Sequence, residues 1–158
     1  MQIRLFQPED TEQIAWLFHN TVRKINIQHY SLEQVTVWSP DDIYFRNWLT
    51  VCSDRFSYVA EKDGKIVGFG ELETNGHIDC FYIHYQHQRQ GIGSLIYQAI
   101  EIKAKKLNLP CLFTEVSITA KPFFISRGFT ILKQQQVLCR GQTLSNYLME
   151  KLLTIEQH

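Results

Sequence analysis

Two glycines, Gly91 and Gly93, mark the part of the chain best suited to hold an anion. They lie in the segment Gln88-Arg89-Gln90-Gly91-Ile92-Gly93, which follows an apolar run that ends at Tyr85. Apolar residues then recur at helical spacing, so a strand, a tight turn and a helix are predicted. The first N–H groups of a helix lack intrahelical partners and carry partial positive charge, and glycine lets a ligand approach the backbone. The pattern therefore predicts a phosphate-binding turn.

Two familiar glycine-rich phosphate loops do not fit this turn. The Walker loop ends in Gly-Lys followed by Ser or Thr, and the dinucleotide fingerprint needs a third Gly or Ala three residues after the second. Here Gly93 is followed by Ser94-Leu95-Ile96. The loop therefore disfavours an unrelated nucleotide-binding protein, although that class stays an alternative at this point.

A second motif comes later in the chain, with Ala120, Phe123 and Gly128-Phe129 at its fixed positions. Together the two segments resemble the signatures of the GCN5-related N-acetyltransferases (GNAT), a Gln/Arg-x-x-Gly-x-Gly/Ala loop and an Ala-x-x-Phe/Leu-Tyr-x-x-x-Gly-Phe helix. They also occur in the order found in that family. The resemblance covers the chain from Ile3 to Leu152, although the first part matches mainly by the order of its elements.

The resemblance implies that acetyl-CoA is the acyl donor and assigns its contacts. Backbone amides of the glycine loop would hold the pyrophosphate, Ser94 would add a hydroxyl, and backbone groups of Ile83 and Tyr85 would bind the pantetheine arm. No metal is expected. The positions assigned to the cofactor are Ile83, Tyr85, Gln88, Arg89, Gln90, Gly91, Ile92, Gly93, Ser94, Ser117 and Phe124.

Acetyl transfer to an amine also needs a group that removes a proton, because an ammonium has no lone pair to attack a thioester. The resemblance places this base near the start of the strand from His77 to Tyr85, so His77 and Asp79 are the candidates. His77 titrates near neutral pH, whereas Asp79 would need a raised pKa. Glu71 and Glu73 are alternatives, and each of the four could instead be a solvated residue beside a turn.

One departure from the family pattern affects the leaving group. Phe124 stands where many members have a tyrosine that protonates the departing thiolate, and Ser117 stands where an asparagine is common. Phenylalanine has no proton to give, but a thiol pKa of roughly 8.5 makes the thiolate a moderately good leaving group. Water, Tyr147 or Tyr82 could take the role of the acid, although core packing is the more ordinary role for these tyrosines.

The surrounding elements follow from apolar spacing and turn residues. Three sequential antiparallel strands before the glycine loop argue against a Rossmann fold. Side-chain alternation places His77, Asp79 and Phe81 on one face of their strand and Ile78 and Cys80 on the other. The predicted strands are 2–6, 56–61, 66–72, 77–85, 111–116, 131–139 and 142–152, and the predicted helices are 10–25 with an Asp10–Gln13 capping box, 31–38, 41–52, 92–107 and a short one before Gly128.

We therefore expect an α/β (α+β) fold of the GNAT type in a single domain, residues 1–158. The resemblance implies a mixed, mostly antiparallel seven-stranded sheet that splays between its fourth and fifth strands and is flanked by helices. Tyr30 and Trp38, in an aromatic-rich segment, are predicted to wall the acceptor pocket. Packing against the sheet is the alternative for both.

Composition limits the partners. Sixteen basic and sixteen acidic residues balance, so net charge gives no support for a nucleic-acid or membrane surface. The four cysteines are widely spaced, which predicts neither a zinc site nor a redox motif. With no long apolar run, a cytoplasmic location is expected. The expected partner is a small-molecule or peptide amine, and the chain is expected to be a monomer or a homodimer.

The sequence thus predicts an N-acetyltransferase that moves an acetyl group from acetyl-CoA to a primary amine by direct attack. A non-catalytic CoA-binding sensor is the alternative, because Phe124 replaces the usual acid. The sequence does not identify the acceptor.

Overall fold

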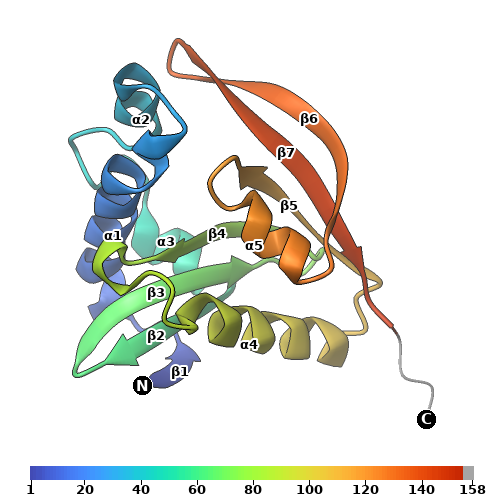
Figure 1. Ribbon diagram of the computed structural model, residues 1–158. Helices are drawn as coiled ribbons and strands as arrows, with labels where there is room; N and C mark the ends of the chain where they lie inside the picture. Colours follow the sequence, from blue (N-terminus) through green and yellow to red (C-terminus); the bar gives the residue numbers. More distant parts are fainter. Residues whose placement is uncertain (155–158) are drawn as a thin grey trace.

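The structure, a computed structural model, describes residues 1–154. Figure 1 shows α4 lying along β3 and the short α5 lying beside β5. The elements are β1 (Gln2–Leu5), η1 (Pro8–Asp10), α1 (Thr11–Lys24), η2 (Asn26–Gln28), α2 (Leu32–Trp38), α3 (Trp48–Ser53), β2 (Phe56–Lys62), β3 (Lys65–Leu72), β4 (Ile78–Ile83), η3 (Tyr85–His87), α4 (Ile92–Lys106), β5 (Cys111–Ser117), α5 (Lys121–Ser126), β6 (Thr130–Cys139) and β7 (Gln142–Leu152).

The strands form two sheets that meet at one point. The first is antiparallel with the order β1-β2-β3-β4, and the second is antiparallel with the order β5-β7-β6. Within residues 1–154, a single parallel bridge joins His77, the residue before β4, to Phe113 of β5. Beyond this bridge the two strands diverge, so the predicted splay between the fourth and fifth strands is confirmed (Figure 1).

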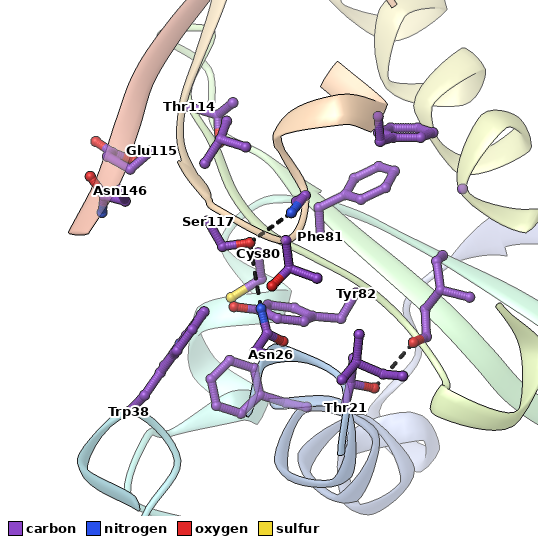
Figure 2. Close-up of a pocket in the computed structure, with 18 of the residues that line it drawn as sticks. Thr21, Asn26, Trp38, Cys80, Phe81, Tyr82, Thr114, Glu115, Ser117 and Asn146 are labelled. Atoms are coloured by element: carbon purple, nitrogen blue, oxygen red, sulfur yellow. Dashed lines mark hydrogen bonds between the residues drawn. The ribbon is translucent and has the colours of Figure 1, made fainter. Parts of the chain in front are cut away.

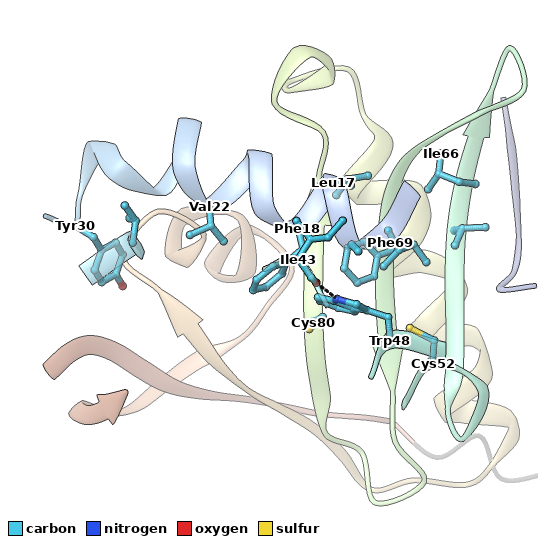
Figure 3. Packing of buried hydrophobic residues seen from close by; sticks show 14 of the residues in the cluster. Leu17, Phe18, Val22, Tyr30, Ile43, Trp48, Cys52, Ile66, Phe69 and Cys80 are labelled. Carbon is cyan, nitrogen blue, oxygen red and sulfur yellow. Dashed lines mark hydrogen bonds between the residues drawn. The ribbon is translucent and has the colours of Figure 1, made fainter. Parts of the chain in front are cut away.

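Helices cover both faces of the first sheet. The apolar face of α1, with Leu17 and Phe18, packs on Phe69 of β3 and on Trp48 of α3 (Figure 3). The opposite face packs on α4 through residues such as Ile96. Full burial of each large apolar side chain contributes about 1.5–3 kcal/mol. These two layers hold β4 and the start of α4 in fixed positions.

A β-bulge in β4 changes the predicted alternation of its side chains. The pairing with β3 shifts between Gly70↔Phe81 and Leu72↔Ile78, so β4 carries one extra residue there. Ile78 therefore packs in the same cluster as Phe81, whereas Cys80 packs in the other. The prediction that Ile78 and Cys80 share a face was wrong, because a bulge reverses side-chain direction within a strand.

Two further expectations about the N-terminal half were wrong. The helix predicted over 41–52 is confined to Trp48–Ser53, because the Asp42 carboxylate accepts from Tyr44 N–H (2.9 Å) and the Asn47 amide caps α3. The Asp10–Gln13 capping box does not form. Asp10 instead accepts two hydrogen bonds from the Arg4 guanidinium, at 2.8 and 2.9 Å.

Strand β4 also ends earlier than predicted, at Ile83, so that Tyr85 belongs to η3. Among the residues described, no helix combines the length and the apolar character that crossing a membrane requires.

Candidate active site

A cavity of about 680 Å³ opens where β4 and β5 diverge. Its walls come from α1, the segment around α2, the two splayed strands, the start of α4, and the turn between β6 and β7. In Figure 1, α2 and that turn lie on one side of the splay and α4 on the other. The cavity therefore has a glycine-turn end, at the N-terminus of α4, and an α2 end.

The backbone at the glycine-turn end is shaped to receive an anion. Gly91 is the N-cap of α4 with φ 79°, and Arg89 has φ 61°. The first intrahelical bond runs from Leu95 N–H to Gly91 O, so the N–H groups of residues 92–94 have no intrahelical acceptor. A Cβ built on Gly91 meets no protein atom within 4 Å. Open space therefore lies beside the first N–H groups of α4.

Side chains at this end support the turn and add positive charge. Gln88 Nε2 donates to Ile83 O (2.6 Å), which fixes the loop to the end of β4. Ser94 Oγ accepts from Arg127 Nη2 (2.6 Å), and Arg127 was not singled out from the sequence. His87 Nδ1 is buried, lines the cavity and has no hydrogen-bond partner among the described residues. A phosphate acceptor at this end would match this donor set.

The assigned cofactor positions fall into two groups. Most of them line the cavity, whereas Tyr85 and Gln90 are outside its lining, and the Tyr85 ring instead stacks on His84 with centroids 4.7 Å apart. Those that line it are Ile83, Gln88, Arg89, Gly91, Ile92, Gly93, Ser94, Ser117 and Phe124.

The cleft between the strands has both backbone and side-chain walls. Ser117 Oγ at the end of β5 accepts from Ala120 N–H (3.0 Å) and from the Asn26 amide (3.4 Å), as Figure 2 shows. Thr21 Oγ1 donates to Ile83 O (3.1 Å). Phe124 is buried, and its ring lies 5.5 Å from that of Phe81. Because β4 pairs with β3 on its other edge, its cleft-side backbone groups face the cavity.

Tyr30 and Trp38 both line the α2 end, with ring centroids 5.2 Å apart. The Tyr30 hydroxyl is fully engaged, since it donates to Ser145 O (2.6 Å) and accepts from Ile118 N–H (2.9 Å). Tyr30 therefore contributes its ring, and no free hydroxyl, to the cavity.

Asp79 lines the cavity and belongs to a paired charge network. Arg46 Nη2 donates to Asp79 Oδ2 (2.8 Å), and Arg55 contacts the same oxygen. The buried Glu71 carboxylate accepts a hydrogen bond from Arg46 Nη1 (3.1 Å). The sequence signal for this network was weak, because Arg46 is distant in the chain from β4.

The same guanidinium explains a cluster that would otherwise suggest a metal. Ligand atoms of Glu71, Asp79 and Cys80 lie within 4.8 Å of one another. Arg46 donates to all three, including Cys80 Sγ at 3.2 Å. A positive charge therefore already sits among these ligands. Burial, followed by the Glu71 charge, raises the pKa of the Cys80 thiol well above its usual value.

His77 lies outside the cavity lining, between two carboxylates. Its Nε2 contacts Glu115 at 2.5 Å and its Nδ1 contacts Glu73. The hydrogen bond to Glu115, with that to Glu73, raises the pKa of His77 to about 9. Glu115 does line the cavity, and its hydrogen bond to His77 lowers its pKa. Glu115 was not identified from the sequence, because it is one polar residue in an alternating strand.

The tyrosines considered as acids occupy different places. Tyr82 lines the cavity beside Cys80, and burial raises the pKa of its hydroxyl well above the usual value (Figure 2). Tyr147 is outside the lining, and Lys121 Nζ lies 4.4 Å from its ring centroid. Asn146, adjacent to it on β7, does line the cavity, and its Oδ1 is buried with no partner among the described residues.

Comparison with known proteins agrees with this architecture. The family model described as "Acetyltransferase (GNAT) domain" matches residues 26–153. An uncharacterized N-acetyltransferase, YafP, of Escherichia coli K12 is 32% identical over 150 residues, which covers 94% of each chain.

Solved structures lead to the same family. A GCN5-related N-acetyltransferase structure from Rhodopseudomonas palustris, whose full description adds "Aminotransferase, Class-II", has a TM-score of 0.90 at 28% identity and covers 96% of this chain and 95% of its own. The PaiA N-acetyltransferase of Thermoplasma acidophilum, solved with coenzyme A, has a TM-score of 0.80 at 19% identity, with coverage of 96% and 98%. At 19% identity, the likeness to the PaiA structure shows a shared fold and nothing more. The chain belongs to the GNAT family of acetyltransferases.

Proposed function

We propose that the protein transfers an acetyl group from acetyl-CoA to a primary amine by direct attack. The observation that carries this proposal is a shared cavity. The first N–H groups of α4, the open edge of β4 and the carboxylate of Asp79 all border it. Donor and acceptor could therefore meet without a covalent enzyme intermediate.

On the donor side, this chain's contribution is to bind and orient. The N-terminus of α4 would receive the pyrophosphate, and the Arg89 side chain would add a charge-assisted contact. The cleft-side backbone of β4 up to Ile83 would align the pantetheine arm. Bound acetyl-CoA supplies an acetyl thioester, which is the electrophile. The relative solved with coenzyme A supports this choice of donor.

On the acceptor side, Asp79 is the proposed recipient of the amine's proton, directly or through a water. Both arginines contact its Oδ2, so Oδ1 is the oxygen proposed to accept the proton. His77 suits this role poorly, because a pKa of about 9 keeps it protonated at neutral pH. Glu115 is the second carboxylate of the cavity and the alternative recipient.

Tyr82 is proposed to stabilise the departing thiolate in place of the tyrosine missing at Phe124. Its raised pKa means that it keeps its proton. The expected contribution is therefore a donated hydrogen bond, and the thiolate would acquire its proton from solvent. Tyr147 was the sequence prediction for this role, and its position outside the cavity lining favours Tyr82.

The experiment has two stages, which separate an enzyme from a CoA-binding sensor. Calorimetry should show binding of acetyl-CoA and no binding of NAD or ATP. Release of free thiol should then be measured with a panel of primary amines. Absence of acetyl-CoA binding contradicts the proposal, and tight binding with no turnover across the panel would favour the sensor.

A further inference from the structure

The α2 end of the cavity has mostly aromatic walls. The rings come from α1, from α2 and the segments that flank it, and from β4, and they form two contacting groups. Phe18 lies 4.9 Å from Tyr82 and 5.8 Å from Phe45, measured between centroids. The rings that line this end are Phe18, Tyr30, Trp38, Phe45 and Tyr82. Figure 2 shows Trp38 and Tyr82 facing the same space.

Charged side chains at this end already have partners within the protein. Asp79 is paired with Arg46, and Glu115 with His77. A further cation, Arg140, lies over the Phe45 ring at 5.0 Å and is part of the wall. An acceptor with charges besides its amine would have to compete with these ion pairs. The α2 end therefore favours an acceptor whose remaining part is uncharged.

The α2 end is also closed by hydrogen bonds between α2 and the β6–β7 hairpin. Gln34 Nε2 donates to Thr143 O (2.8 Å), and Arg140 Nη1 donates to Val37 O (2.7 Å). The Tyr30 hydroxyl adds its bond to the hairpin. A protein chain reaching the cavity from this side would have to break several of these bonds. The closure therefore favours a small molecule.

Near the α2 end, Asn146 contributes a polar atom that lacks a hydrogen-bond partner among the described residues. Asn146 Oδ1 is buried, and a buried acceptor without a donor is unfavourable because it has lost its hydration without gaining a hydrogen bond. An N–H of the acceptor amine would satisfy it. Asn146 pairs with Ser117 across β5 and β7, so this atom lies where the aromatic end meets the cleft between the strands.

We infer that the acceptor is a small primary amine with an uncharged aromatic body, an arylalkylamine. The inference rests on the proposed function and names its substrate class. The ring would lie among the aromatic side chains, and the amine would donate a hydrogen bond to Asn146 Oδ1. The nitrogen forms a bond to the acetyl carbon while the carbon–sulfur bond breaks. The bonding electrons go to sulfur, and the nitrogen's proton leaves to Asp79.

The first test compares four amines at saturating acetyl-CoA: 2-phenylethylamine, 2-cyclohexylethylamine, spermidine and a tetrapeptide with a free N-terminus. We expect kcat/KM for 2-phenylethylamine to exceed that for the cyclohexyl analogue by about tenfold, because the saturated ring loses the aromatic contacts. The polyamine and the peptide should be weaker still. Preference for either of those two, or no difference between the two rings, overturns the inference and leaves the acetyltransferase proposal standing. Failure of every amine, with acetyl-CoA bound, contradicts the proposed function instead.

The second test uses variants, with Trp16→Leu as the matched control for Trp38→Leu. Trp16 is an exposed tryptophan outside this cavity. Trp38→Leu and Asn146→Ala should each raise KM for 2-phenylethylamine about tenfold or more and leave the Kd for acetyl-CoA unchanged. Trp16→Leu should change neither. A weaker Kd for acetyl-CoA in Asn146→Ala would assign that oxygen to the pantetheine arm and overturn its role toward the amine.

Discussion

The two ends of the cavity present different kinds of groups to a ligand. At the glycine-turn end, the groups aimed at a ligand are mainly backbone N–H groups of one continuous segment. At the α2 end, the groups are side chains that come from distant segments, such as Phe18, Arg46 and Asn146. A site made of backbone groups can be recognised in the sequence from glycines at fixed spacing. A site made of side chains from distant segments has no such motif and is recognised only in the folded protein. The donor could thus be inferred from a short motif, and the acceptor only from the assembled cavity.

The largest expected effect tests the backbone end. Gly91→Val should weaken acetyl-CoA binding at least about 100-fold, because the new side chain enters the space beside the α4 N–H groups and the loss of two charge-assisted hydrogen bonds suffices for that factor. Gly64→Val is the matched control, since Gly64 also has positive φ (76°) and open space around it. Both variants should lose about 1–3 kcal/mol of stability through backbone strain. Calorimetry at a temperature where both are folded gives the comparison, and normal binding by Gly91→Val would place the donor elsewhere.

The next effect tests whether a side chain carries the proton transfer. Asp79→Asn should lower kcat by about 100-fold, because the proton acceptor is lost, and leave the Kd for acetyl-CoA unchanged, because the glycine-turn end is not altered. Glu73→Gln is the control, since Glu73 also pairs with Arg55 and lies outside the cavity lining. Steady-state rates between pH 6 and pH 10 should reveal the difference. Equal losses in both variants would assign Asp79 a structural role.

A smaller effect is expected at the leaving group. Tyr82→Phe should lower kcat by about tenfold, which corresponds to one donated hydrogen bond of about 1.5 kcal/mol. Tyr147→Phe provides the comparison, and its kcat should stay near that of the unmodified protein. Should Tyr147→Phe be the slower of the two, the role returns to the residue first predicted from the sequence.

The smallest expected effect is a pH-dependent contribution of His77 to the stability of the fold. The pKa of His77 is raised from 6.5 to about 9, so its ion pairs stabilise the fold fully below about pH 6.5, and this stability is lost as the pH rises through about 9. His77→Gln should therefore lower Tm at pH 6 and have little effect at pH 10. Thermal unfolding of both proteins at the two pH values measures this. A constant difference in Tm would show that the ion pairs contribute nothing.

Much of the fold was predictable because strong local patterns agreed with the tertiary packing. The glycine turn, α4 and the final hairpin all followed from spacing and turn residues. The region between Pro40 and Trp48 was mistaken for helix, because the hydrogen bond made by the Asp42 side chain to the backbone outweighed apolar periodicity. The bulge in β4 had no local signal at all.

Among the site residues, those in a local motif were predictable and those brought together only by folding were not. Loop residues such as Gly91 and Ser94 could be placed from one motif, whereas Glu115 and Asn146 could not, since single polar residues in strands usually face solvent. Tyr30 and Trp38 were predicted as pocket walls, and both line the cavity. The roles assigned to individual residues are still predictions.

The single bridge between His77 and Phe113 also has a consequence for solvent exchange. Where two strands pair, they protect one another's amide hydrogens, but among the described residues the edge of β4 that faces the cleft has no strand paired along it. Those amides should take up deuterium quickly in the free protein and slowly once a ligand occupies the cleft. A mass-spectrometric exchange profile of residues 78–83 would thus report donor binding without any chemical turnover.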